Sequence, residues 1–129
     1  MELKQLEKKF NFKLTDEVKV IRNEQEALDL IGGTFRVGEI NRTYRELVNG
    51  LGEPTFDTPS VDNKIQVRWV CKFKGNVYTI YDWKTYDREI TEWKLNQFNV
   101  GSKNARGYEV SEFVDVVRKQ IDKENNLIR

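Results

Sequence analysis

The chain has 129 residues, of which 38% are apolar and 33% are charged, and its formal net charge is +1. This length and balance predict a soluble, globular protein with a single domain over residues 1–129, which needs neither metals nor disulfides to fold. No apolar run approaches the roughly 20 residues of a membrane span, and the N-terminus lacks the apolar stretch of a signal peptide. We therefore expect a cytoplasmic protein without a membrane partner.

The chain contains no histidine and a single cysteine, Cys71. Without histidine, Ser-His and Cys-His nucleophiles and zinc sites built from cysteine and histidine are all excluded. Histidine is also the usual general base near neutral pH. The sequence therefore predicts no catalytic residue, no metal site and no cofactor. Cys71 has no intrachain disulfide partner, and its place in an alternating segment predicts a small, buried side chain.

Helices and one short strand are predicted in the first half of the chain. Apolar spacing over residues 3–10 suggests a short, lysine-rich helix, and residues 18–21 suggest a strand. Asn23 then provides an N-cap, with Glu26 three residues later, for a helix that ends at Gly32-Gly33. A second helix is predicted from one face of five apolar residues: Ile40, Tyr44, Leu47, Val48 and Leu51.

Glycine and proline separate this second helix from the segment that follows. Gly52 favours a left-handed helix end and Pro54 prevents the helix from resuming. Residues 55–63 are predicted to be a polar connector.

The segment from Ile65 to Phe98 holds all three tryptophans and about half of the aromatic side chains. Residues 65–73 alternate with period two, Gly75-Asn76 suits a two-residue turn, and residues 77–83 form the return strand. In this register Arg68 faces Trp83. A three-residue loop would instead place Arg68 against Asp82 and move Trp83 to the other face, and the sequence leaves the two registers open.

A third strand is predicted over residues 92–100, followed by a polar loop over 99–107. The closing helix, at about 108–123, has one apolar face formed by Val110, Phe113, Val114, Val117 and Ile121. The fold class is therefore α+β, in which a small antiparallel sheet (hairpin 65–83 plus strand 92–100) packs against helices.

One face of the hairpin is interpreted as core and the other as a contact surface. Trp69 and its neighbours at period two are the core face. The opposite face, with Tyr81 and Trp83, is either covered by a helix or exposed among cations, and an exposed aromatic patch of this kind resembles a protein-interface hot spot. The predicted partner-binding residues are Arg68, Tyr81, Trp83, Lys84, Tyr86 and Arg88.

Charge is distributed unevenly along the chain. Between Lys64 and Arg106, nine basic and four acidic side chains give a net charge of +5, whereas the remainder carries −4. Cations mixed with aromatics are also typical of proteins that bind single-stranded nucleic acid, so a nucleotide or single strand is the alternative partner. A solvated outer face of ordinary lysines explains the same pattern.

The loop 101–107 precedes the closing helix and contains small residues, a hydroxyl and two cations. Free N–H groups at a helix start attract anions, so the predicted anion or nucleotide site consists of Ser102, Lys103 and Arg106. The spacing is not that of a P-loop, and a plain capped loop is the competing interpretation.

Four carboxylates, Asp82, Asp87, Glu89 and Glu92, lie close together in the sequence. They are considered as a magnesium site or an acid/base pair. Because basic residues alternate with them, surface ion pairs are the favoured interpretation.

Several short motifs, taken together, resemble a group of small, poorly characterised bacteriophage-encoded proteins over roughly residues 34–115. The motifs are Tyr44-Arg45-Glu46-Leu47-Val48, Leu51-Gly52-Glu53-Pro54, Tyr81-Asp82-Trp83-Lys84, Trp93 and Val100-Gly101. The resemblance implies a viral accessory protein of the host cytoplasm that binds and inhibits a host protein, for example a defence factor, and it transfers no catalytic residue. The helix, the Leu-Gly-x-Pro turn and the tryptophan strand also resemble periplasmic β-lactamase-inhibitor repeats, although a signal peptide is missing. A homodimer formed through an exposed strand edge is a further option.

Overall fold

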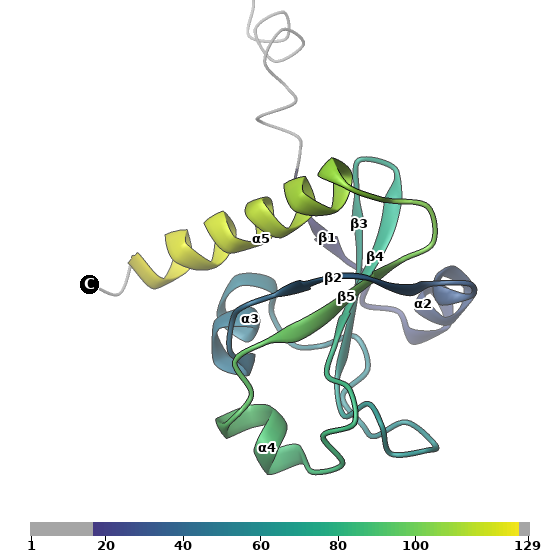
Figure 1. The fold of residues 1–129 in the computed structure, drawn as a ribbon, viewed down its shortest axis with the longest axis vertical. Coiled ribbons are helices and arrows are strands. Elements are labelled where there is room, and N and C mark those ends of the chain that lie inside the picture. The colour runs from purple at the N-terminus through teal and green to yellow at the C-terminus, as the bar shows by residue number, and fades with distance from the viewer. Residues whose placement is uncertain (1–16, 127–129) are drawn as a thin grey trace, which may run out of the picture.

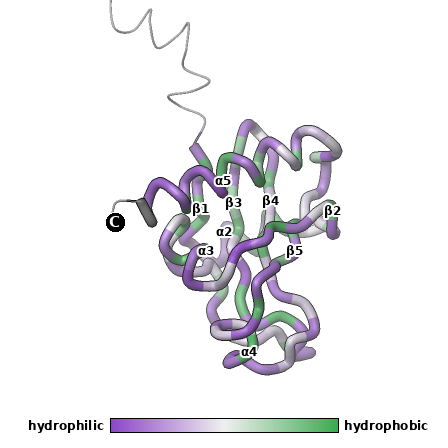
Figure 2. Tube along the Cα trace, turned by 60° about the vertical axis from the view of Figure 1, so that its left-hand side comes forward, coloured by the Kyte–Doolittle hydropathy of each residue, from purple (hydrophilic) through white to green (hydrophobic). Residues whose placement is uncertain are grey.

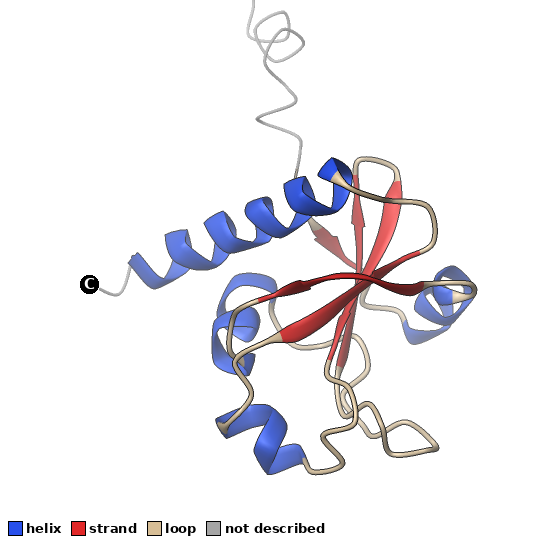
Figure 3. Cartoon of the chain, in the orientation of Figure 1, coloured by secondary structure: helices blue, strands red, loops and turns tan. Residues whose placement is uncertain are grey.

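A computed structural model describes residues 17–126 of the chain, so the helix predicted over residues 3–10 lies outside the described residues. The described part is an antiparallel sheet of five strands in the order β1-β3-β4-β5-β2, with helices on both sides (Figures 1 and 3). This arrangement confirms the α+β class. In chain order the elements are β1 (Lys19–Val20), α2 (Glu24–Ile31), β2 (Phe35–Ile40), α3 (Tyr44–Leu51), β3 (Arg68–Phe73), β4 (Asn76–Tyr81), α4 (Arg88–Trp93), β5 (Phe98–Ser102) and α5 (Tyr108–Asn126).

The main core lies between the sheet and the two helices α3 and α5. Trp69 is fully buried there, and the ring of Tyr78 stacks on Phe113 of α5 at 4.0 Å between centroids. All five residues of the predicted apolar face of α5 are buried, which confirms that prediction. In Figure 2 hydrophobic positions gather on the strands, while hydrophobic and hydrophilic residues alternate along α5. None of the helices among residues 17–126 is long and apolar enough to cross a membrane.

The second predicted helix starts later than the sequence pattern suggests. Ile40 is the last residue of β2, an unpredicted strand that pairs with β5. The helix begins at Tyr44, after the N-cap Thr43, whose hydroxyl accepts from the backbone N–H of Glu46 while the Glu46 carboxylate accepts from the Thr43 N–H. This reciprocal capping box starts the helix at Tyr44. The four-residue spacing between Ile40 and Tyr44, which suggested a shared helical face, therefore spans a strand end and a helix start.

The hairpin adopts neither of the two predicted registers. Lys74 and Gly75 form the two-residue turn, with φ angles of 49° and 80°, and Phe73 pairs with Asn76. Positive φ at both central residues matches the right-handed twist of the flanking strands. Arg68 consequently faces Tyr81 rather than Trp83 or Asp82. Because this register differs from the Gly75-Asn76 register by two residues, the same side chains still share each face.

The predicted third strand is wrong in its first half. Residues 88–93 form the short helix α4, whose N-cap Asp87 accepts from the backbone N–H of Glu89 at 2.9 Å. The strand begins only at Phe98 and continues to Ser102, so it takes up part of the predicted polar loop 99–107. The N-cap and the helical hydrogen bonds thus favour a helix in a segment whose aromatic residues suggested a strand. Trp93 consequently lies on the surface of this helix rather than in the sheet.

Candidate functional site

The sheet face opposite the main core is covered only in part by α2. Ala27 of this helix packs against Val70 of β3 in a small second cluster that also contains Ile21. Beyond that cluster the same face carries Arg68 and Tyr81, which are cross-strand partners. The two predictions for this face, that a helix covers it or that it is exposed among cations, therefore each hold in part. The helix covers one end of the face, and cationic and aromatic side chains occupy the other end.

Five side chains form a continuous aromatic and cationic surface at this end, which we call the Trp83 surface: Lys64, Arg68, Tyr81, Trp83 and Lys84. The guanidinium carbon of Arg68 lies 5.1 Å from the centre of the Tyr81 ring, and the ring of Trp83 meets Tyr81 edge-on at 6.4 Å. The ammonium groups of Lys64 and Lys84 lie 5.7 and 5.8 Å from the centre of the Trp83 ring. Trp83 is 48% exposed, whereas Tyr81 is only 9% exposed and supports it from below.

The buried carboxylate of Asp82 holds the chain between Tyr81 and Trp83 in place. Its Oδ1 accepts from the backbone N–H groups of Gln66 at 2.8 Å and Val67 at 3.0 Å. Its Oδ2 accepts from the hydroxyl of Thr91 at 3.0 Å and also from that of Thr85. The sequence suggests metal binding or acid/base chemistry for Asp82 but not this anchoring role, because its four partners lie in loops and one helix that only the fold brings together.

Two loops are tied together beneath Trp83 and Tyr86. The backbone N–H of Lys84 donates to the carbonyl of Lys64 at 2.7 Å, and the Asn63 amide donates to the carbonyl of Tyr86 at 3.3 Å. Lys84 and Tyr86 have φ angles of 58° and 57°, a left-handed conformation that costs a non-glycine residue energy. Such conformations persist where the surroundings impose them, and they often occur at functional sites.

Arg88 belongs to a structural network rather than to the Trp83 surface. Its guanidinium donates to Asp57 at 2.7 Å, to Glu92 at 2.8 Å and to the hydroxyl of Tyr44 at 3.0 Å. Burial acts to lower the pKa of Arg88, but the hydrogen bonds and charges of Asp57 and Tyr44 together raise the pKa overall. Of the six predicted contact residues, Trp83, Lys84 and Tyr86 are exposed, while Arg68 and Arg88 are partly buried and Tyr81 is buried.

Two side chains of the predicted anion site, those of Ser102 and Arg106, are engaged by other parts of the protein. The buried Ser102 hydroxyl donates to the carbonyl of Val77 at 2.8 Å and accepts from the backbone of Ala105. Arg106 donates to two backbone carbonyls of the loop and covers the ring of Phe35 at 4.4 Å. The Glu109 carboxylate accepts from the Arg106 backbone N–H just before α5 begins. Anion binding by Ser102, Lys103 and Arg106 therefore stays a prediction, without support from their local contacts.

Among residues 17–126, no group of three or more acidic, cysteine or histidine side chains is placed to hold a metal ion. Cys71 is fully buried, and this burial raises the pKa of its thiol to about 12. A thiol with this pKa remains protonated at neutral pH and is a poor nucleophile.

Comparison with known proteins identifies no relative of this chain. No family model, no curated protein and no solved structure matches the chain. The resemblance to bacteriophage-encoded proteins therefore stays a prediction.

Proposed function

We propose that this protein is a non-enzymatic binding module that contacts a protein partner through the Trp83 surface. The observation that carries the proposal is the half-exposed Trp83 ring, supported by Tyr81 and flanked by Lys64 and Lys84. Tryptophan, tyrosine and arginine are enriched among the hot spots of protein interfaces, and tryptophan and tyrosine bury a large area at a small cost in conformational freedom.

The charge of this surface favours an acidic partner. The carboxylates of the neighbouring loops are already engaged: Asp62 accepts from Ser60 and from the backbone of Lys64, and Asp87 caps α4. Lys84 is exposed and Lys64 is partly exposed, so both ammonium groups attract opposite charge and repel basic surfaces. In line with the phage resemblance, the proposed partner is a host protein, for example a defence factor, which binding would inhibit.

A pull-down from bacterial lysate with Trp83→Ala tests the contact surface, and Trp93→Ala is the matched control. Both tryptophans are exposed, at 48% and 64%, but Trp93 lies on α4 beneath Arg45 and outside the proposed surface. If Trp83 is an interface hot spot worth about 2 kcal/mol or more, its loss weakens the affinity for the partner by at least about 30-fold and lowers the partner's recovery. Trp93→Ala should recover the partner as the wild type does, with both variants shown to be folded by circular dichroism.

Equal recovery of the same protein by wild type and by Trp83→Ala would refute the assignment of this surface. Nuclease treatment of the lysate separates the alternative function. Trp83-dependent capture of single-stranded nucleic acid, lost steeply as salt rises, would instead favour the nucleic-acid interpretation.

A further inference from the structure

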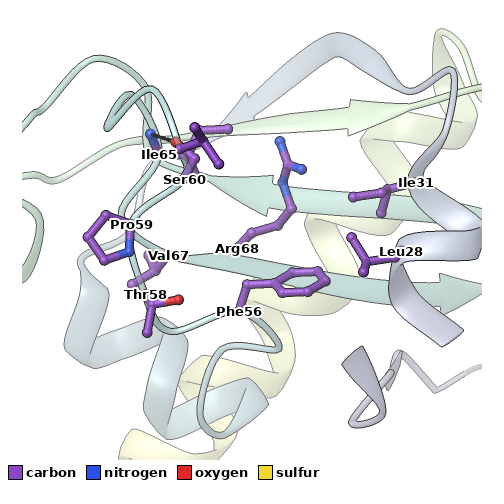
Figure 4. Close-up of a pocket in the computed structure, with 10 residues that line it drawn as sticks. Leu28, Ile31, Phe56, Thr58, Pro59, Ser60, Ile65, Val67 and Arg68 are labelled. Atoms are coloured by element: carbon purple, nitrogen blue, oxygen red, sulfur yellow. Dashed lines mark hydrogen bonds between the residues drawn. The ribbon is translucent and has the colours of Figure 1, made fainter. Parts of the chain in front are cut away.

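A cavity of about 310 Å³, open to solvent, lies between α2, the connector and the start of β3. Leu28 and Ile31 of α2 form one side, and Pro59 and Ile65 lie on the other, with Phe56 and Arg68 between them (Figure 4). The lining is mostly apolar, and Leu28 is 53% exposed. The sequence predicts only a polar connector over residues 55–63 and gives no sign of this cavity.

Arg68 places a positive charge in this apolar lining. Burial lowers the pKa of its guanidinium, which shows that the charged form is poorly solvated there. Its Nε is buried without a hydrogen-bond partner, and its guanidinium packs over the Tyr81 ring; none of the salt bridges among the described residues involves Arg68. A partly desolvated cation with an unused donor is energetically unfavourable until an anion approaches it.

The protein's own carboxylates do not fill this role. Asp82 is the acidic group whose charge acts on Arg68, but its oxygens are taken by two backbone N–H groups and two threonine hydroxyls. None of the described side chains that line the cavity is acidic. The positive charge of Arg68 therefore lies at the apolar lining of the cavity without a carboxylate partner. A ligand for this cavity would combine an anionic group with an apolar body.

We propose that the cavity binds a small apolar monocarboxylate, with its carboxylate on the guanidinium of Arg68 and its apolar body between Phe56 and Leu28. An arginine fork pairs with a carboxylate through two parallel hydrogen bonds, and desolvated surroundings strengthen that pair. The volume lies at the lower end of the range for small-molecule sites, about 300–1,000 Å³, which favours a compact acid. This site goes beyond the proposed protein contact, although Arg68 borders both.

Titration of the ¹⁵N-labelled full chain by NMR, with 2-naphthoate and its neutral analogue 2-naphthamide as probes, tests this inference. We expect saturable shifts at the amides of the cavity, and at least tenfold tighter binding of the acid than of the amide. Arg68→Gln should abolish that preference. Lys72→Gln, on the same strand and outside the cavity lining, removes the same charge and should leave the preference intact.

A second variant keeps the test valid if Arg68→Gln does not fold. Leu28→Glu places a carboxylate at a half-exposed wall position, where it should pair with Arg68 and reduce acid binding at least tenfold. Trp83→Ala should leave acid binding unchanged, which separates this site from the proposed protein contact. Equal affinity for acid and amide, absence of shifts at the cavity, or dependence on Trp83 instead of Leu28 would each overturn the inference.

Discussion

The buried carboxylate of Asp82 offers the sharpest test of how the Trp83 surface is held. Replacing it with alanine removes the acceptor for the backbone N–H groups of Gln66 and Val67, both of which are buried. Each buried donor left without a partner costs about 1–3 kcal/mol, so we expect a loss of about 4 kcal/mol in the free energy of unfolding. The hydroxyls of Thr85 and Thr91 add little, because they lie 3.0 Å apart and can bond to each other.

The Asp82→Asn variant separates hydrogen bonding from the loss of the side chain. Its amide oxygen can still accept from both backbone N–H groups, and its amide nitrogen can donate to the threonine hydroxyls, whose protons rotate. We expect this variant to lose only about 1 kcal/mol. The difference between the two variants thus measures the cost of the orphaned backbone donors.

Urea denaturation followed by far-ultraviolet circular dichroism is the assay, since Trp83 fluorescence would report the local change as well as unfolding. A loss of about 4 kcal/mol is a large part of the roughly 5–15 kcal/mol that stabilises a typical domain. Asp29→Ala, at an exposed position of α2, is the control and should change the stability by about 0.5 kcal/mol at most. Equal losses for Asp82→Ala and Asp82→Asn would refute the reasoning.

Three further predictions concern single positions. Because burial raises the pKa of Cys71 to about 12, its thiol should resist Ellman's reagent at pH 8 until the chain unfolds. The folded state keeps this proton while the unfolded thiol has lost it, so stability should fall as pH rises from about 9 towards 12. Gly50→Ala should lower stability by about 1–3 kcal/mol in urea denaturation despite the higher helix propensity of alanine, because the new Cβ would lie 2.4 Å from Ile121. Arg68→Met should leave the melting temperature unchanged or raise it, since it removes a desolvated charge and keeps an aliphatic side chain over Tyr81; a marked decrease would contradict this.

Local signals explain which elements could be predicted. The N-cap Asn23 and the apolar face of α5 each depend on residues within a few turns of one another, and both are confirmed. Strand β2 escaped prediction because its pairing partner β5 is about sixty residues away and its own sequence lacks clear alternation. The helix α4 escaped for a related reason: a six-residue segment with aromatic and β-branched side chains suits a strand equally well until its cap forms.

For the hairpin, the sequence by itself determined the two strands, their period of two and the presence of a glycine turn. The period of two and the positive φ of Gly75 are properties of the local chain. Only the tertiary structure decided the register, because Lys74-Gly75 and Gly75-Asn76 are both acceptable turns in the sequence.

The two proposed binding sites were decided in the same way. The sequence determined that cations and aromatics are concentrated between residues 64 and 106. Only the tertiary structure brings Leu28, Phe56 and Arg68 to one cavity. It also directs the Asp82 carboxylate to backbone N–H groups, so that Arg68 has no carboxylate partner among the described residues. Composition specifies which charges are present, but desolvation and pairing depend on which neighbours the fold supplies.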